Sequence, residues 1–180
     1  SFSVRDEKSR FHFRDIILNK KLKITDLESV DLDYVDQKNN LNKLNLISID
    51  DIFLLKGTLF NADKFVENLI NDDDKLDIIQ KNFKLNIKID ELILDDKNRL
   101  KNFEGLLTLE NQKIISGRLI GSFSKNKKLK FTVDSRDNEK ITTLFLDKAE
   151  AIVSRYKFIK GFDEGILDFY SSKKDNESVS

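Results

Sequence analysis

The segment FKLNIKID, residues 83–90, decides the fold class of this chain. Its odd-numbered positions are apolar, and its even-numbered positions are polar or charged. Successive side chains of a β-strand point to opposite faces of a sheet. This alternation therefore predicts a strand with one apolar face and one solvated face.

The same period of two recurs on both sides of this segment. It covers residues 103–109, 115–123 and 129–133 downstream, and residues 30–34 and 44–46 upstream. Short polar turns separate the segments, and short connections favour antiparallel pairing of sequential strands over crossovers. The pattern predicts a mainly β chain with roughly ten strands and two short helices.

Each expected helix directly follows a strand. The first follows the apolar segment 54–60, and Asn61 is a suitable N-cap because its side chain can accept a hydrogen bond from an exposed N–H group. Apolar residues at helical spacing then occupy residues 65–70, before the acidic run 72–74.

The second expected helix follows the strand at residues 141–146 and runs from Lys148 to about Ile159. Asp147 is its expected N-cap, with the carboxylate accepting from the N–H of Ala149 or Glu150. The two caps lie roughly 85 residues apart, and recurrence of a supersecondary unit is typical of repeat architectures. We expect residues 1–180 to form a single β segment with two strand–helix units, at approximately 1–80 and 81–180.

The segment LFLDKAEAIVSRYKFIKGFDEGILDFYSSK, residues 144–173, closely resembles the repeating element of the AsmA-like superfamily of Gram-negative envelope proteins, in particular its TamB- and YhdP-type branch. In that family a helix at the sheet edge precedes a glycine turn and a return strand, the place that residues 160–169 occupy here. Residues 162–164 depart from the pattern because they expand the compact turn. The resemblance implies an elongated, curved antiparallel sheet, a half-open β-groove, with two short amphipathic helices at its edge.

A sheet with one apolar face needs a cover, and two short helices are too small for roughly ten strands. The cover can be a second sheet layer, a tight roll of the sheet, or a ligand in an apolar groove. On pattern alone, a closed sandwich core is as good an interpretation as a groove. The resemblance favours the groove and implies that phospholipid acyl chains lie in it.

The residues expected to line this lipid groove share the apolar face of the predicted strands. They are Phe83, Leu85, Ile87, Ile89, Leu107, Leu109, Leu119, Phe123, Phe131 and Val133.

Composition excludes several other functions. The 32 basic and 32 acidic side chains cancel, so the chain lacks the field expected of a nucleic-acid-binding protein. It contains no Cys, which excludes disulfides, thiolate nucleophiles and Cys-type zinc sites. No run approaches the roughly 18 apolar residues of a membrane span. The absence of Met leads us to expect a processed chain or, more readily, a fragment of a longer protein.

Candidate catalytic and metal-binding motifs are weak. His12 is the only histidine, lies in an alternating strand and is expected to face solvent. The glycines at 117 and 121 match no phosphate-binding loop and are expected to let the sheet bend. The acidic run 72–74 lacks the spacing of a calcium loop. Four lysines at 125, 127, 128 and 130 could contact anionic head groups or nucleic acid, but a solvated turn is the favoured interpretation.

The resulting hypothesis is a non-enzymatic segment without cofactor or metal. By resemblance, the intact protein would be anchored in the inner membrane, cross the periplasm and move phospholipid towards the outer membrane, with no nucleic-acid partner. The alternative hypothesis is a structural or adhesive β-repeat module whose apolar face forms a closed core.

Overall fold

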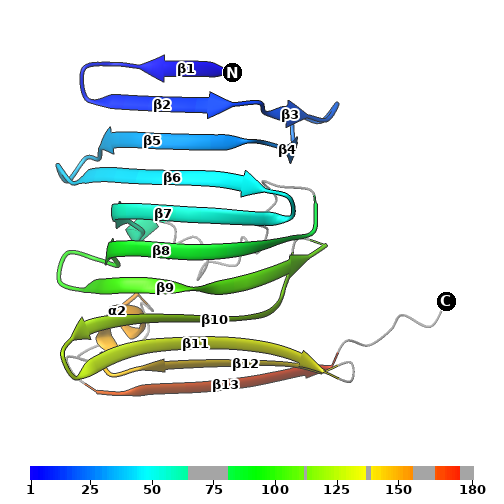
Figure 1. The fold of residues 1–180 in the computed structure, drawn as a ribbon. Coiled ribbons are helices and arrows are strands. Elements are labelled where there is room, and N and C mark those ends of the chain that lie inside the picture. Colours follow the sequence, from blue (N-terminus) through cyan, green and yellow to red (C-terminus); the bar gives the residue numbers. More distant parts are fainter. Residues whose placement is uncertain (65–80, 112, 137–138, 156–164, 175–180) are drawn as a thin grey trace.

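The computed structural model describes residues 1–64, 81–111, 113–136, 139–155 and 165–174. These residues form one large, open sheet of eleven strands and a separate pair of short strands (Figure 1). The fold is mainly β and mostly antiparallel, as the alternation predicts. None of the helices in the described ranges is long and apolar enough to cross a membrane.

The strands of the large sheet lie in the order β1-β2-β5-β6-β7-β8-β9-β10-β11-β12-β13. Their bounds are Phe2–Arg5 (β1), Ser9–Arg14 (β2), Ser29–Val35 (β5), Leu41–Ile49 (β6), Ile52–Asn61 (β7), Phe83–Ile93 (β8), Arg99–Glu110 (β9), Lys113–Ser124 (β10), Lys127–Arg136 (β11), Glu139–Leu146 (β12) and Leu167–Lys174 (β13). Strands β3 (Ile17–Leu18) and β4 (Ile24–Asp26) pair with each other. Strand order therefore follows chain order, apart from this short excursion between β2 and β5.

One neighbouring pair departs from the predicted antiparallel pairing. Strands β7 and β8 are parallel, with Phe53 opposite Leu85 and Leu55 opposite Ile87. Parallel neighbours need a crossover connection, which a short turn cannot supply. Most of the connection lies outside the described residues, and the expected apolar helix stripe at 65–70 lies there too.

Two amphipathic helices were expected, and the described part of the chain shows only one short helix, α2 (Glu150–Val153), since most of the first expected helix lies outside the described residues. Asp63 and Lys64 are helical where the first helix was expected to start. The Asn61 side chain accepts a hydrogen bond from the Asp63 N–H at 3.1 Å, so this predicted cap interaction is confirmed. The expected second helix is shorter than predicted within its described residues, and residues 156–159 lie outside them.

Asp147 is not the N-cap of α2. Its carboxylate instead accepts a hydrogen bond from the Lys128 N–H at 2.9 Å, which joins the ends of β11 and β12. The helix begins after Ala149, whose N–H donates to the Gly165 carbonyl at 2.9 Å. The sequence predicted that the Asp147 carboxylate would accept a hydrogen bond at the start of this helix. The Gly165 backbone carbonyl accepts from the Ala149 N–H instead.

One row of cross-strand partners runs through all eleven strands on a single face. Directly opposed residues share a face, so the row can be followed from each strand to the next. Its members are Phe2, Phe13, Val30, Leu46, Leu55, Ile87, Gly105, Leu119, Phe131, Leu144 and Phe169. Ten of these are apolar side chains and the eleventh is glycine, so the apolar face is continuous from β1 to β13.

The glycine in this row sits where two backbones approach closely. A Cβ built on Gly105 would lie 1.9 Å from the Arg118 carbonyl oxygen, and one on Gly117 would lie 2.5 Å from the Leu106 oxygen. Register irregularities between Ile114 and Ser116 flank this contact of β9 with β10. Glycine is therefore required here by lack of space.

Replacing Gly105 by alanine should destabilise the fold by about 2–3 kcal/mol, because backbone must move to admit the methyl group. Urea unfolding followed by circular dichroism measures this change. Ser116→Ala, on the neighbouring strand, should stay within about 0.5 kcal/mol of wild type. Equal stability of the Gly105→Ala variant and wild type would show that the close approach is not needed.

Candidate functional site

The ten residues predicted to line the groove lie on the apolar face, and most belong to one hydrophobic cluster. They divide into two groups by exposure. The buried group consists of Ile87, Ile89, Leu107, Leu109 and Val133. The partly buried group consists of Phe83, Leu85, Leu119, Phe123 and Phe131. The buried group is core of this chain, so only the second group is accessible to a ligand.

The N-terminal strands extend the apolar face beyond the residues selected from the sequence. Phe2 and Val4 are 55% and 56% exposed. Phe2 stacks on Phe13 with ring centroids 4.6 Å apart, and Phe11 stacks on Tyr34 at 5.7 Å. The sequence signal for these strands is the alternation of phenylalanine with a polar residue at 11–13.

The apolar face near β12 is covered by α2. Ala149 and Ala151 are 1% and 0% exposed, and Ala151 and Ile152 pack in the hydrophobic cluster with Leu146. Alanine allows the short helix to approach the sheet closely. The apolar face is therefore covered near β12 and exposed at both edge strands, where Phe2 on β1 is 55% exposed and Phe169 on β13 is 46% exposed.

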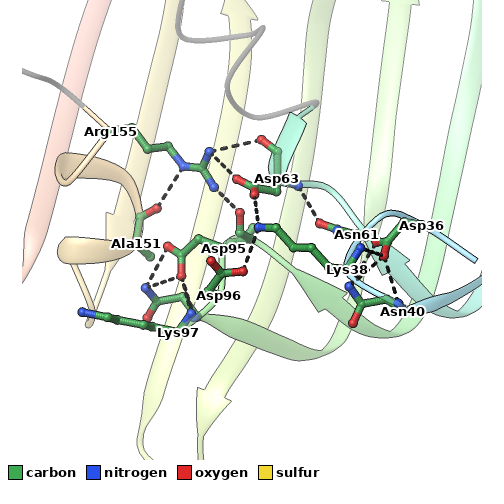
Figure 2. A network of polar contacts seen from close by, with 12 residues as sticks. Asp36, Lys38, Asn40, Asn61, Asp63, Asp95, Asp96, Lys97, Ala151 and Arg155 are labelled. Carbon is green, nitrogen blue, oxygen red and sulfur yellow. Dashed lines mark hydrogen bonds and ion pairs between the residues drawn. The ribbon is translucent and has the colours of Figure 1, made fainter.

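A network of polar side chains closes the end of the sheet beside α2 (Figure 2). Arg155 is its centre: its Nη1 donates to the Asp63 carbonyl at 3.1 Å and pairs with the Asp63 carboxylate at 3.0 Å. Its Nη2 donates to the Leu94 carbonyl, and its Nε donates to the Ala151 carbonyl at 3.4 Å. One guanidinium thus joins α2, the end of β8 and the start of the segment after β7.

Asp63 also binds Lys38, which reaches over from the turn between β5 and β6. The Lys38 ammonium lies 2.9 Å from Asp63 and 2.7 Å from Asp96. Burial by itself would raise the pKa of Asp63, but the hydrogen bonds from Lys38 and Arg155 outweigh it, and the pKa is lowered. The hydrogen bonds to Asp96 and Asp63 raise the pKa of Lys38.

Asp36 organises the adjoining turn. Its carboxylate accepts from the Asn61 amide at 2.6 Å and from the Asn40 backbone N–H at 2.9 Å. Burial acts to raise the pKa of Asp36, but these hydrogen bonds, together with one from Asn42, lower it well below the usual range. The fully buried Asn42 accepts from the Asn61 N–H at 2.6 Å, so the turn is locked to the end of β7.

This network has the character of a structural clamp. Its charged groups are paired with one another and with backbone carbonyls. The described residues include no group of three or more His, Asp or Glu side chains that could hold a metal ion. His12 lies on the polar face of the sheet, where its Nδ1 shares a hydrogen bond of 2.6 Å with the Ser3 hydroxyl.

Comparisons with known proteins add no relative: no family model, curated protein or solved structure matches this chain.

Removing the Arg155 side chain should destabilise the fold. Its side chain is 12% exposed, and Arg155→Met would remove the donor to three backbone carbonyls and leave the Asp63 carboxylate with Lys38 alone, at a cost of about 3 kcal/mol. Arg155→Lys should recover less than half, because one ammonium cannot reproduce the planar fork. Urea unfolding measures both variants.

The control for Arg155 is Arg136, whose pair with Asp134 is 81% and 50% exposed. Arg136→Met should cost less than about 1 kcal/mol, as is typical of surface ion pairs. Equal losses for the two methionine variants would contradict the clamp.

The lowered pKa of Asp36 predicts a pH-dependent contribution to stability. A carboxyl with a depressed folded-state pKa stabilises the fold above its usual pKa of about 4, and this contribution is lost as the pH falls below that value. Asp36→Asn should therefore be less stable than wild type at pH 7 and lose less stability on acidification. The free energy of unfolding between pH 7 and pH 2 measures the difference, using urea.

Gln37→Ala is the control, because Gln37 is exposed, adjacent and does not titrate. It should keep the wild-type dependence on pH. If the free energy of unfolding of Asp36→Asn fell with decreasing pH as steeply as that of wild type, the lowered pKa of Asp36 would not explain the pH dependence.

Proposed function

We propose that this chain is a non-enzymatic segment of an AsmA-like lipid-transfer protein, and that it binds phospholipid acyl chains along its apolar face. The observation that carries the proposal is the row of apolar residues and one glycine across eleven strands, which is exposed at Phe2 on β1 and at Phe169 on β13. The acyl chain would contact the partly buried and exposed members of this face, since the buried members already pack within the chain.

The width of the N-terminal strands supports an acyl chain as the occupant of their half-buried and exposed apolar residues, although Leu44 on β6 and Phe53 on β7 are buried. Five adjacent strands, β1, β2, β5, β6 and β7, span four spacings of roughly 4.8 Å, or about 19 Å. An acyl chain in one leaflet occupies about half of the ~30 Å bilayer core, or about 15 Å. A single chain laid across these strands would thus contact apolar residues along its whole length.

The energetics need no specific polar contact. Each methylene removed from water contributes about 0.8 kcal/mol. The buried apolar area of an acyl chain that lies over several strands would therefore be enough to bind it. The aromatic pairs Phe2–Phe13 and Phe11–Tyr34 offer flat apolar surfaces for it. The polar side chains of the opposite face would keep the other side of the sheet hydrated. By the resemblance stated above, we place the protein in the periplasm, anchored to the inner membrane.

Lipid analysis of the purified chain tests this proposal. The 180-residue protein is purified without detergent, extracted with organic solvent and analysed for phospholipid by mass spectrometry. Near-stoichiometric phospholipid is expected. The variants Val4→Asp and Phe131→Asp should retain much less, because a carboxylate on the apolar face opposes contact with hydrocarbon.

The matched controls place the same charge on the other face: Ser3→Asp beside Val4, and Lys130→Asp beside Phe131. Both should keep wild-type lipid content, and circular dichroism should show that all four variants are folded. A folded wild-type protein without lipid that also fails to bind a hydrophobic dye would overturn the proposal. That outcome would favour the structural or adhesive module with a closed core.

A further inference from the structure

The two edge strands of the large sheet, β1 and β13, are open on their outer sides. Within the described ranges β1 pairs only with β2, and β13 pairs only with β12. Unpaired backbone N–H and C=O groups along such an edge can pair with a strand of another chain. Exposed apolar side chains accompany them: Phe2 and Val4 on β1, and Phe169 and Tyr170 on β13. Both edges therefore combine unpaired backbone with apolar surface.

Most of the features that protect a sheet edge from pairing are missing from these two strands. Proteins usually protect an edge with a bulge, a proline or lysines along the strand. The chain contains no Pro, and the β1–β2 and β12–β13 pairings keep an unbroken register. Lysine occurs in the two strands only at the last two positions of β13, Lys173 and Lys174. The whole of β1 and residues 167–172 of β13 are therefore suited to strand pairing.

The two edge strands run in opposite directions. Nine of the ten neighbouring strand pairs in the sheet are antiparallel and one, β7–β8, is parallel, so β13 is antiparallel to β1 (Figure 1). A second copy placed beyond β13, with its apolar face on the same side, brings its own β1 antiparallel to β13. Because sheets twist, this copy is also rotated about the axis along which the strands follow one another. The pairing is of the kind that most neighbours in the sheet already adopt.

The charges at the two edges are complementary in such a pairing. Two registers place Phe169 opposite an apolar residue of the next copy, which is Phe2 in one register and Val4 in the other. Asp168 then lies diagonal to Arg5 in the first register and directly opposite it in the second, and both positions are within reach of an arginine. Asp168 and Arg5 are exposed, and neither has an ion pair with another described residue.

We propose that copies of this chain associate head to tail, with β13 of one copy antiparallel to β1 of the next and Asp168 paired with Arg5. Within its own chain Arg5 lies opposite Arg10, so a carboxylate on its other side offsets a repulsion between like charges. Two different edges meet in this contact, which therefore builds an open assembly and not a closed dimer. Pairing of two β1 edges would offer Arg5 no carboxylate from that strand. The association does not depend on lipid binding, because it uses the strand edges.

Sedimentation velocity of the 180-residue chain, purified without detergent, tests the proposal over about a hundredfold range of concentration. The wild type should form species larger than a dimer whose size grows with concentration. Arg5→Glu and Asp168→Arg should each weaken association at least about tenfold, because each places like charges at the contact. An equimolar mixture of these two variants should associate to within about threefold of wild type, because every contact in an alternating assembly again joins opposite charges.

The matched controls are Arg118→Glu on β10 and Asp90→Arg on β8, which make the same charge changes at exposed positions of inner strands. Both should associate like wild type, and circular dichroism should show that all variants are folded. Four results would each overturn the proposal: no association of wild type, equal weakening by the controls, weakening by only one edge variant, or no recovery in the mixture. Weakening by one edge variant alone would indicate β1–β1 or β13–β13 pairing. Phospholipid content is measured in the same preparations, so failure of the association is distinguishable from failure of lipid binding.

Discussion

The register of the whole sheet depends on keeping one apolar row in line across eleven strands. Because side chains alternate between faces, a slip of one residue at most strands would carry polar residues into this row and apolar residues into water. The row therefore favours the observed pairing at most strands. Its one gap, Gly105, coincides with the close approach of β9 and β10, where no side chain fits.

Apolar burial has no direction and does not determine where strands end. The clamp at the end beside α2 supplies that information through directed hydrogen bonds. Arg155 contributes most, because its planar fork binds three backbone carbonyls, those of Asp63, Leu94 and Ala151, as well as the Asp63 carboxylate. The apolar row and the clamp are complementary: the row sets register, and the clamp joins the short helix to the ends of the central strands.

The two faces of the sheet have separate chemistry. One face is apolar, and Phe2 on β1 is 55% exposed there. The other face carries charged and polar side chains around an open cavity of about 910 Å³. A single twisted layer can present both surfaces because period-two alternation sends neighbouring residues in opposite directions.

Alternation alone determined that the chain is mainly β and which residues share the apolar face, because the side-chain period of a strand is local. The Asn61 cap was likewise predictable, since its partner lies two residues away. Only the tertiary structure decided that β7 and β8 are parallel, that Asp147 binds the Lys128 N–H, and that the Arg155 side chain bonds the Asp63 carbonyl from 92 residues away. It also decided which apolar residues are buried and which are exposed. An alternation of period two specifies the face of the sheet on which a residue lies. It specifies neither which strand lies beside that residue nor what covers the face, because both depend on contacts between residues distant in sequence.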